Sequence, residues 1–414
     1  MNNECVRRNS AAWICCQLGA REQYAVPRAL HRVNALNRLL TDAWIPPGNL
    51  FGVLRRSLHE RFHSDLSTAP VRAWNMELVG FELAARAKRL SGWHLILARN
   101  RWFQLKIVEF LTTDHGRLTT DQPILFSYSY TALEPFRFAK AHGWKTVLGQ
   151  IDPGLPEERL VARLCGKHPE YAGEWKPAPP EYWRDWREEC QLADSIVVNS
   201  DWSRRLLAEE GIPATKMQII PLAFQPHDRS LQPKEYPRQF TKERPMRVLF
   251  LGQINLRKGV APLLEAANRL RSEPIEFWMI GPLQISNAVA GAHDAPIRWI
   301  GPVSRGRAGE YYRQADVFIL PTLSDGFGLT QLEALARKLP VIVSKNCGTV
   351  IRDGVDGVLL PEPTCEAIIR ALLACLHHPE QLAAFSSNAM VRDKFTLDSL
   401  RRSLLRLQKE LIEY

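Results

Sequence analysis

The sequence predicts an α/β protein made of two doubly wound domains, each with a parallel sheet between layers of helices. Three observations support this prediction. The chain has 414 residues, which is too many for one compact core. Short apolar runs alternate with helical patterns in both halves, as parallel sheets require. Between the halves, residues 224–246 contain four prolines and many charges, which is typical of a linker.

The predicted strands are short apolar runs bounded by polar or turn-forming residues. In the first half they are Trp13–Leu18, Arg38–Thr41, Ile124–Tyr128, Lys145–Ile151 and Ser195–Asn199. In the second half they are Arg247–Leu251, Ile275–Ile280, Ile297–Ile300, Val317–Leu320 and Val341–Val343. Predicted helices lie between them, including Leu133–His142, Ser203–Glu210, Ala261–Arg271, Ala308–Gln314 and Leu329–Arg337. We therefore expect domains at residues 1–223 and 247–394, joined by the linker 224–246, and a terminal helix at 395–414.

Composition and cysteine usage are those of an ordinary globular protein, with 45% hydrophobic and 24% charged residues. No apolar run is long enough to predict a membrane span. The eight cysteines form no Cys-x-x-Cys pair, and several lie in apolar runs, which predicts reduced thiols in a cytoplasmic protein. Arg7 and Arg8 precede a short apolar run, as in a signal peptide; the alternative interpretation is a first strand that ends at Gly19.

The formal net charge of +10 is concentrated in the first third of the chain. Residues 1–150 hold 20 Lys and Arg against 11 Asp and Glu, which leaves +9. This excess indicates an acidic partner, such as a phosphorylated substrate, an anionic lipid surface or nucleic acid, or else a solvated surface with extra arginines. No recognition helix or aromatic platform is evident, so we expect no nucleic-acid partner.

Residues 72–111 interleave tryptophans with arginines and lysines. Such a segment can lie on a membrane surface, because amphipathic helices with basic and aromatic faces do so. It can equally pack on the first sheet, since leucine and alanine fill the same stretch. Both interpretations stay open at this point.

The stretch SDGFGLTQLEALA at residues 324–336 follows a predicted buried strand and opens a helix. Gly326 and Gly328 have no Cβ, so a phosphate or sugar can approach the backbone closely, and free N–H groups at a helix start attract anions. Glu333 lies on an apolar stripe, where an unpaired charge is costly, so we expect it to hold a ligand such as the hydroxyls of a ribose. Asp325 stands just before the helix. A cap and an interfacial acid are the alternative interpretation.

A second loop of this kind follows the strand Arg247–Leu251. It reads GQINLRKG from Gly252 to Gly259, and the adjacent Arg257 and Lys258 could clamp a pyrophosphate. Solvated surface cations are the alternative. Neither loop is a Walker A motif, and no Gly-x-Gly-x-x-Gly occurs, which argues against kinase chemistry and ordinary dinucleotide binding.

Taken together, these motifs resemble the retaining glycosyltransferases of family four (group 1), which have the GT-B fold. The signature of that family, two acids eight positions apart around Gly-Phe-Gly-Leu, stands here as Asp325 to Glu333. Further matches in the same order include Lys258-Gly259, Ile280-Gly281, Trp299 to Val303, Ala315-Asp316-Val317, Pro340-Val341 and Gly348. The resemblance is densest between Met246 and Pro361.

The resemblance implies roles for the matching positions. Glu333 would bind the ribose of a nucleotide sugar, and Lys258 would neutralise the leaving diphosphate, with Asp325 as the third catalytic residue. Donor contacts are expected at Gly19, Gly252, Arg257, Val303, Gly326, Phe327, Gly328 and Leu329. Asp325 replaces the family's glutamate, Gln253 stands where an arginine is usual, and Gln150 and Asp152 occupy the region where a histidine is often found.

The resemblance further implies a hexosyltransferase-type enzyme that retains the anomeric configuration and requires no metal or cofactor. Its partners would be a nucleotide-sugar donor and a carbohydrate or lipid-linked acceptor in polysaccharide or glycolipid assembly. The basic first domain would suit an anionic acceptor, or peripheral contact of a cytoplasmic protein with the inner face of an anionic membrane. The terminal helix would cross back to the first domain. A non-catalytic nucleotide-sugar-binding protein of the same fold is the alternative.

Overall fold

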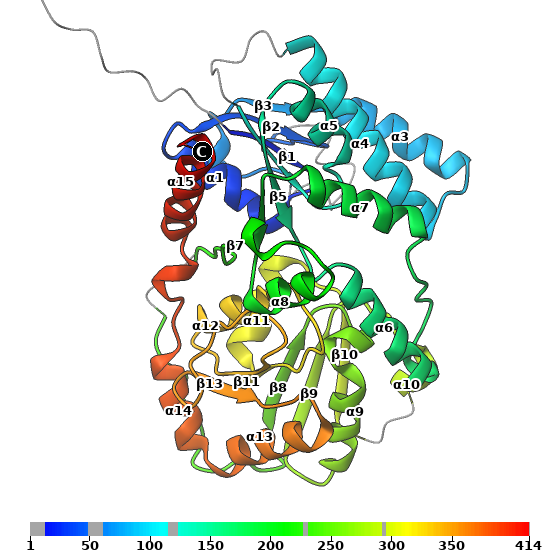
Figure 1. The fold of residues 1–414 in the computed structure, drawn as a ribbon. Helices are drawn as coiled ribbons and strands as arrows, with labels where there is room; N and C mark the ends of the chain where they lie inside the picture. Colours follow the sequence, from blue (N-terminus) through cyan, green and yellow to red (C-terminus); the bar gives the residue numbers. More distant parts are fainter. Residues whose placement is uncertain (1–12, 49–60, 115–122, 227–230, 292–294, 414) are drawn as a thin grey trace, which may run out of the picture.

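Two parallel β-sheets organise the chain, one in each half (Figure 1). The structure is a computed structural model, and it describes residues 13–48, 61–114, 123–226, 231–291 and 295–413. In this part of the chain the first sheet has seven strands in the order β3-β2-β1-β4-β5-β6-β7, and the second has six in the order β10-β9-β8-β11-β12-β13. The predicted fold class, two doubly wound domains, is confirmed.

The strands of the first sheet are β1 Trp13–Gln17, β2 Leu36–Thr41, β3 Val71–Ala73, β4 Ile124–Tyr128, β5 Lys145–Gln150, β6 Ser195–Val198 and β7 Met217–Ile219. Those of the second sheet are β8 Met246–Leu251, β9 Ile275–Ile280, β10 Ile297–Gly301, β11 Val317–Leu320, β12 Val341–Ser344 and β13 Gly357–Leu360. All ten predicted strands are present. The short edge strands β3, β7 and β13 were not predicted. Residues 1–12, which include the signal-like start, lie outside the described residues.

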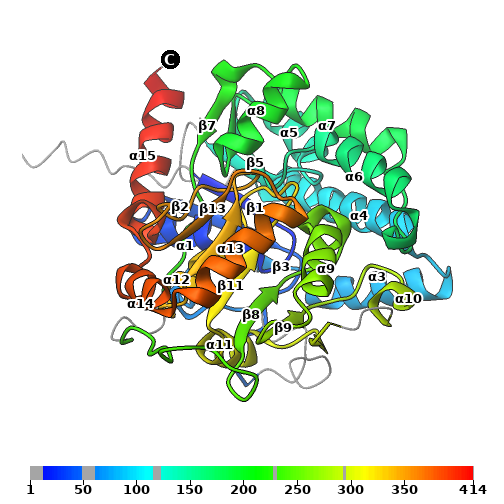
Figure 2. The same ribbon diagram turned by 90° about the horizontal axis from the view of Figure 1, so that it is seen from below.

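Helices cover both faces of each sheet. In the first half they are α1 Ala25–His31, α3 Asn75–Ala87, α4 Gly92–Asp114, α5 Leu133–Ala141, α6 Leu155–Lys167, α7 Pro180–Leu192 and α8 Asp201–Glu209. In the second half they are α9 Val260–Arg269, α10 Asn287–Gly291, α11 Arg305–Gln314, α12 Thr330–Leu335, α13 Cys365–His377, α14 Pro379–Asn388 and α15 Leu397–Glu413. Figure 2 shows α9 and α13 side by side over the second sheet.

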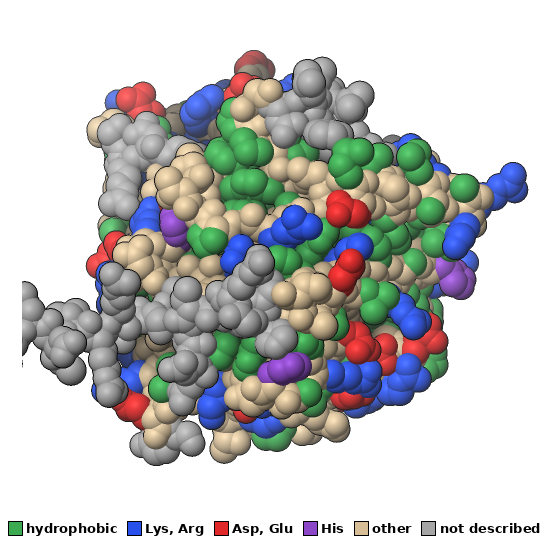
Figure 3. All heavy atoms as spheres, turned by 90° about the horizontal axis from the view of Figure 1, so that it is seen from above, with side chains coloured by type: hydrophobic (Ala, Val, Ile, Leu, Met, Phe, Trp, Pro, Cys, Tyr) green, Lys and Arg blue, Asp and Glu red, His purple; other side chains and the backbone are tan. Residues whose placement is uncertain are grey.

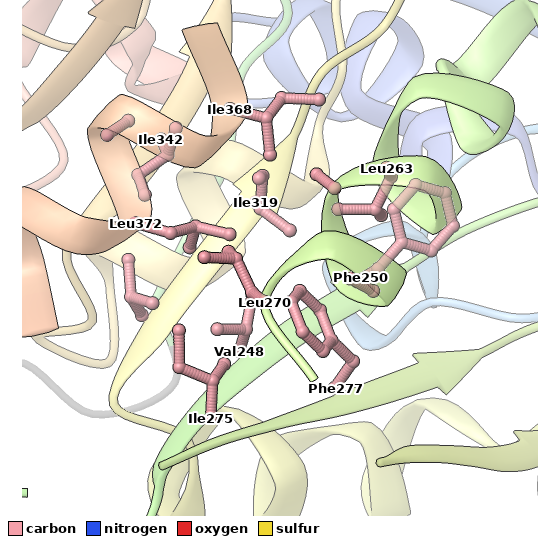
Figure 4. Close-up of a cluster of buried hydrophobic side chains, with 14 of the residues drawn as sticks. Val248, Phe250, Leu263, Leu270, Ile275, Phe277, Ile319, Ile342, Ile368 and Leu372 are labelled. Atoms are coloured by element: carbon pink, nitrogen blue, oxygen red, sulfur yellow. The ribbon is translucent and has the colours of Figure 1, made fainter. Parts of the chain in front are cut away.

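Strands that are buried on both faces need apolar side chains throughout, which explains the continuous apolar runs of the sequence. In the second domain, Phe250 of β8 and Phe277 of β9 pack on one face against Leu263 of α9 and Leu372 of α13 (Figure 4). The opposite face buries Phe318 against Leu332 and its neighbours. The first sheet likewise has a separate core on each face.

The strand order places a reversal in each sheet, and this reversal locates the ligand-binding edge. The chain builds outward from β1 or β8 to one edge and then returns to the other, so the reversals lie between β1 and β4 and between β8 and β11. Open parallel sheets bind ligands at the carboxyl ends of the strands beside such a reversal. The loops after β8 and β11 are the two that the sequence motifs indicate.

The chain crosses between the two domains twice, and the crossings touch. The first crossing runs between the end of β7 and the start of β8, and the second enters α15. Where they meet, the backbone N–H of Phe224 donates to the carbonyl of Phe395 at 2.8 Å. The terminal helix α15 then packs beside α1 of the first domain (Figure 1), and the indole of Trp13 donates to Gln408 at 2.7 Å.

The α15 helix is held by leucines at helical spacing, and this supplies the first prediction. Leu404 is fully buried in a core of the first domain. Replacing it with alanine removes apolar contacts and leaves a cavity, so Leu404→Ala should lower the free energy of unfolding by about 2–5 kcal/mol. Urea denaturation followed by circular dichroism measures this change. The matched control is Arg402→Ala on the exposed face of α15, which should change stability by less than about 0.5 kcal/mol. Equal stability of the two variants would contradict the packing described here.

Candidate functional site

The loop after β11 carries the first sequence motif, and its glycines are required by the backbone. Gly328 has φ of +77°, and a Cβ there would lie 2.8 Å from Leu320 and 2.9 Å from Gln331. The helix that follows, α12, spans only Thr330–Leu335, which is shorter than the predicted Leu329–Arg337. A helix of under two turns adds little dipole field. Charged side chains add to the electrostatic field at this site.

The loop after β8 supplies those side chains and is locked onto the first loop. Asn255 caps the short 3₁₀ helix η7 (Leu256–Lys258), because its Oδ1 accepts the Lys258 N–H at 3.1 Å. The carbonyl of Arg257 accepts the N–H of Leu323 at 2.8 Å and the hydroxyl of Thr322 at 3.1 Å. Gly259 has φ of +74°, and a Cβ there would lie 1.9 Å from the Pro321 carbonyl. No larger residue fits where the loops meet.

Lys258, Arg257 and Asp325 form one charge cluster at these strand ends. The Lys258 ammonium forms a close ion pair with Oδ2 of Asp325, and Nη1 of Arg257 lies 3.8 Å from Oδ1. Burial alone raises the pKa of the Asp325 carboxyl, but Lys258 and Arg257 outweigh it and hold that pKa below its ordinary value. The N–H of Phe327 also donates to Asp325. The structure thus brings together three of the predicted residues.

Glu333 lies on α12 and pairs with a different partner. Its Oε2 accepts the hydroxyl of Tyr312 at 2.9 Å, and the Tyr312 ring lies under the guanidinium of Arg337 at 5.2 Å. Burial raises the pKa of Glu333, and Tyr312 and Arg337 lower it in part. The side chain is half-buried. Glu333 is therefore a hydrogen-bond acceptor whose orientation Tyr312 fixes. It follows the loop that carries Asp325, and the described interactions include no direct contact between the two carboxylates.

The remaining predicted donor contacts lie in different local environments. Gly252 directly follows β8 and donates its N–H to the Ile280 carbonyl at 2.9 Å. Val303 and Leu329 are half-buried against the core that contains Phe327. Gly19, in the first domain, has φ of +84° and donates its N–H to Asp42 at 2.9 Å.

Two predicted contacts have structural tasks that the sequence did not indicate. The Phe327 ring is buried, and a Cβ on Gly348 would lie 2.4 Å from it. Gly326 faces the first domain, since a Cβ there would lie 2.3 Å from the Ile151 carbonyl. The Gly326 carbonyl accepts the hydroxyls of Ser200 at 2.7 Å and Ser203 at 3.3 Å. The glycine lets the two domains touch, a task that differs from the close ligand approach predicted for it.

Sequence reasoning missed a carboxylate that the first domain contributes. Glu157, at the start of α6, accepts the hydroxyl of Ser324 at 2.7 Å and lies 3.4 Å from Nη1 of Arg257. Burial, assisted by Asp152 and Asp325, raises the pKa of Glu157 to about 7, although Arg257 and Ser324 oppose the rise. Acids in the first turn of a helix usually complement its dipole, so the sequence carried no signal for this contact.

Gln150 and Asp152, the candidates at the end of β5, have different environments. Gln150 is buried, and it accepts the indole N–H of Trp186 at 3.0 Å. Asp152 lies on the wall of a cavity between the two domains, together with Glu157 and Arg257.

One cluster in the described chain has the spacing of metal ligands, but a cation already occupies it. Glu265, Cys365 and Glu366 place their ligand atoms within 4.8 Å of one another. The Arg269 guanidinium lies among them, 2.9 Å from Glu366 and 3.5 Å from Cys365. The cluster lies on α9 and α13, away from the two loops, and the absence of a metal requirement remains a prediction.

Comparison with known proteins finds similarity that is densest in the second domain. Residues 245–378 match the family model described as "Glycosyl transferases group 1". A D-inositol 3-phosphate glycosyltransferase of Geodermatophilus obscurus is 32% identical over 209 residues, which cover 44% of this chain and 46% of the relative. The protein of the same name from Kribbella flavida is 26% identical over 227 residues, which cover 49% of this chain and 53% of that relative. The chain thus spans about half the length of these relatives.

Solved structures show the same fold over nearly the whole chain. Sucrose-phosphate synthase from Thermosynechococcus elongatus aligns with a TM-score of 0.64 at 17% identity, over 97% of this chain and 99% of that one. Anabaena HepE in complex with UDP-glucose aligns with a TM-score of 0.62 at 15% identity, over 97% and 100%. The second domain thus matches the group 1 glycosyl transferase model over residues 245–378, and the chain has the two-domain GT-B fold of these structures.

The raised pKa of Glu157 predicts how stability depends on pH. A buried acid with a pKa of about 7 favours the folded state when protonated, so its contribution is complete below its ordinary pKa near 4.5 and is lost as the pH rises toward 7. Glu157→Gln should therefore raise the melting temperature at pH 8 and flatten its change between pH 5 and pH 8. Calorimetric scans measure this effect, and about 1 kcal/mol corresponds to about 2–4 °C. The exposed Glu209→Gln on α8 is the control. If both variants follow the wild-type profile, Glu157 is not a titrating group of the domain junction.

Proposed function

We propose that this protein is a retaining glycosyltransferase that moves a sugar from a nucleoside diphosphate donor to a hydroxyl group of a glycan or glycolipid. One observation carries the proposal: Lys258 and Arg257 meet Asp325 at the strand ends of a group 1 glycosyl transferase domain, directly against the first domain. Two adjacent cations held by a carboxylate form a receptor for a diphosphate, because charge-assisted contacts to phosphate are strong.

In the proposed reaction, the bond between the anomeric carbon and the donor phosphate oxygen breaks, and its electron pair stays on the diphosphate. Lys258 and Arg257 stabilise the charge that develops there. The acceptor oxygen bonds to the same face of the oxocarbenium-like carbon, and its proton passes to the departing phosphate oxygen. Asp325 keeps both cations in place, so little reorganisation is needed when the charge moves.

Glu333 would anchor the donor at the other end. Tyr312 fixes one carboxylate oxygen at 2.9 Å, so the side chain is oriented before a ligand arrives. Ribose hydroxyls are suitable donors to such a carboxylate, and a hydrogen bond to a charged group contributes about 1.5–3 kcal/mol. This anchor would place the diphosphate over the cation pair.

We choose UDP-glucose as the first donor to test, since Anabaena HepE, which has the same fold, was crystallised with it. We also propose that no divalent metal is required, because Arg257 and Lys258 supply positive charge where the diphosphate would lie. The alternative is a nucleotide-sugar-binding protein without turnover. It is favoured by the close Asp325–Lys258 pair, which turns this carboxylate toward its own domain, and by Gln253 in place of the usual arginine.

The donor anchor supplies a test of the proposed activity. Glu333→Gln keeps the size of the side chain but weakens its acceptor, so kcat/KM for UDP-glucose should fall about 10- to 100-fold. UDP release by the purified chain, measured with and without EDTA, checks this; equal rates in both conditions are expected. The exposed Glu310→Gln on α11 is the matched control. Full activity of Glu333→Gln would refute the anchor, and UDP binding without release across donors and acceptors would favour the binding protein.

We propose in addition that the first domain contacts an anionic membrane through α3. The α4 helix agrees with the interpretation in which residues 72–111 pack on the first sheet, since Phe103 and Ile107 are fully buried. The α3 helix does not, since Met76 is 62% exposed and Leu83 is 60% exposed, and they share a stripe with Val79. Figure 3 shows hydrophobic and basic side chains interspersed on the side of the domain where α3 and α4 lie.

Charge favours a membrane as the occupant of this face. Arg86, Lys88 and Arg89 are exposed at the end of α3, next to its apolar stripe. An apolar stripe flanked by basic residues is the pattern of helices that lie in an anionic interface. No helix among the described residues has both the length and the apolar content to cross a bilayer. The contact would therefore be peripheral.

Vesicle sedimentation tests this surface. Each basic residue near an anionic surface contributes about 1 kcal/mol, so Lys88→Ala should weaken binding to phosphatidylglycerol-containing vesicles about fivefold, and Leu83→Ser should weaken it further. Vesicles of phosphatidylcholine alone should bind weakly. Val355→Ser, which alters an exposed apolar side chain of the second domain, is the control. Vesicle binding that is equal for all three variants would refute the assignment to α3.

A further inference from the structure

A cavity of about 890 Å³ lies between the two domains, and its lining includes Arg257 of the charge cluster and Glu157, which pairs with Arg257. Its first-domain wall is formed by α4, α6, α7 and the loop before α5, and its second-domain wall by η7 and residues 283–287. The domains touch again at its rim, where a Cβ on Gly173 would lie 2.5 Å from the Gln284 carbonyl. A volume of this size suits a small ligand of one or two rings.

Aromatic side chains form one wall of this cavity. Tyr130 and Tyr182 are stacked, with ring centroids 4.6 Å apart and an interplanar angle of 18°. Trp183 meets Tyr182 edge-on at 5.0 Å, and Trp93 lies 4.9 Å from Tyr182. Flat aromatic faces of this kind suit the C–H faces of a sugar or cyclitol ring, which are apolar and carry partial positive charge, opposite to the ring face.

The backbone at Tyr130 is held in a conformation that needs support. Tyr130 has φ of +74°, which is uncommon for a residue with a bulky side chain. Buried Glu189 supports it, because its Oε2 accepts the Tyr130 N–H at 2.7 Å and its Oε1 accepts the N–H groups of Ala132 and Leu133 at 2.7 and 3.1 Å. The Tyr130 hydroxyl then donates to Oδ1 of Asp152 at 2.6 Å. Strained residues that their surroundings hold in this way cluster at binding sites.

Asp152 leaves one oxygen for a ligand. Its Oδ1 accepts Tyr130, the Gly154 N–H at 2.9 Å and Gln150 at 3.3 Å. Within the described residues, Oδ2 accepts no hydrogen bond from the protein. A ligand hydroxyl could donate to Oδ2.

The charge of the wall selects against anions. The lining holds four carboxylates, from Asp152, Glu157, Glu158 and Glu174, against one guanidinium, from Arg257, which Glu157 and Asp325 already pair. Like charges brought together in an interface are strongly disfavoured. A phosphorylated ring, as in the acceptor for which the inositol phosphate relatives are named, would bring its phosphate among these acids.

We infer that this cavity is the acceptor site and that it binds an uncharged, polyhydroxylated ring, which stacks on Tyr182 and donates a hydroxyl to Asp152. The inference rests on the proposed function, because only a transferase has an acceptor. Binding of the ring, however, can be tested without turnover. It also replaces the expectation, drawn from the sequence, of an anionic acceptor. The basic excess of the first domain includes the exposed cations of α3, and the cavity itself is acidic, so an anionic acceptor does not fit.

Saturation-transfer NMR on the full chain, with UDP present, tests the inference directly. The probes are methyl α-D-glucopyranoside and myo-inositol, each compared with its phosphorylated form, glucose 6-phosphate and inositol 1-phosphate. We expect saturable binding of at least one neutral probe, and phosphorylated partners that bind on the order of tenfold more weakly. Tighter binding of the phosphorylated probes, or no saturable binding of either neutral probe, would overturn the inference.

Two variants assign the binding to the cavity. Tyr182→Ala should weaken binding of the neutral probe on the order of tenfold, whereas Tyr182→Phe, which keeps the ring, should leave it unchanged. Asp152→Asn, which keeps the size of the side chain, should reduce the discrimination against the phosphorylated probe. Unchanged binding in both Tyr182→Ala and Asp152→Asn would place the ring elsewhere.

UDP release is measured in parallel and separates the two claims. If the neutral ring binds in the cavity but no nucleotide sugar is turned over, the cavity inference stands and the proposed function fails. If UDP is released and the preferred acceptor is phosphorylated, the proposed function stands and the cavity inference fails.

Discussion

Arg257 is the cation on which the junction of the two domains depends. Its carbonyl ties the loop after β8 to the loop after β11, and its side chain lies between Asp325 of its own domain and Glu157 of the other. The guanidinium is 20% exposed, and the carboxylates beside it are 12% and 15% exposed. Charges this well shielded are costly unless they are paired. The glycines at 259 and 326 serve this arrangement, because they allow the backbones to meet where the charges do.

Much of the fold could be predicted from the sequence because the central strands are buried on both faces. Continuous apolar runs such as those of β8 and β11 are readily interpreted as buried strands, and all ten predicted strands are present. The edge strands β3, β7 and β13 are three or four residues long, and their burial is partial. A short strand at the edge of a sheet takes its structure from its neighbour, so its own residues carry little periodic signal.

The candidate site was predictable only as far as it lies within one domain. Lys258, Arg257 and Asp325 follow strand ends that the apolar pattern indicated, so their meeting follows from the topology. Glu157 could not be found in this way, because it belongs to the other domain and depends on how the two domains face each other. The task of Gly326 was misassigned for the same reason, since its neighbour is Ile151 and local sequence cannot name it.

The paired crossings at Phe224 and Phe395 have a mechanical consequence. They lie beside α14 and α15, whereas α6 and α10 lie on the opposite side of the junction in both ribbon views (Figures 1 and 2). Residues of α6 and α10 line the cavity, so the cavity is on that side too. Two adjacent segments of chain that join two domains can act as a hinge, and the axis of that hinge passes close to them. A rotation about that axis would move the cavity rim further than it moves the crossings. Opening about this axis would therefore separate Gly173 from Gln284, which meet at the cavity rim.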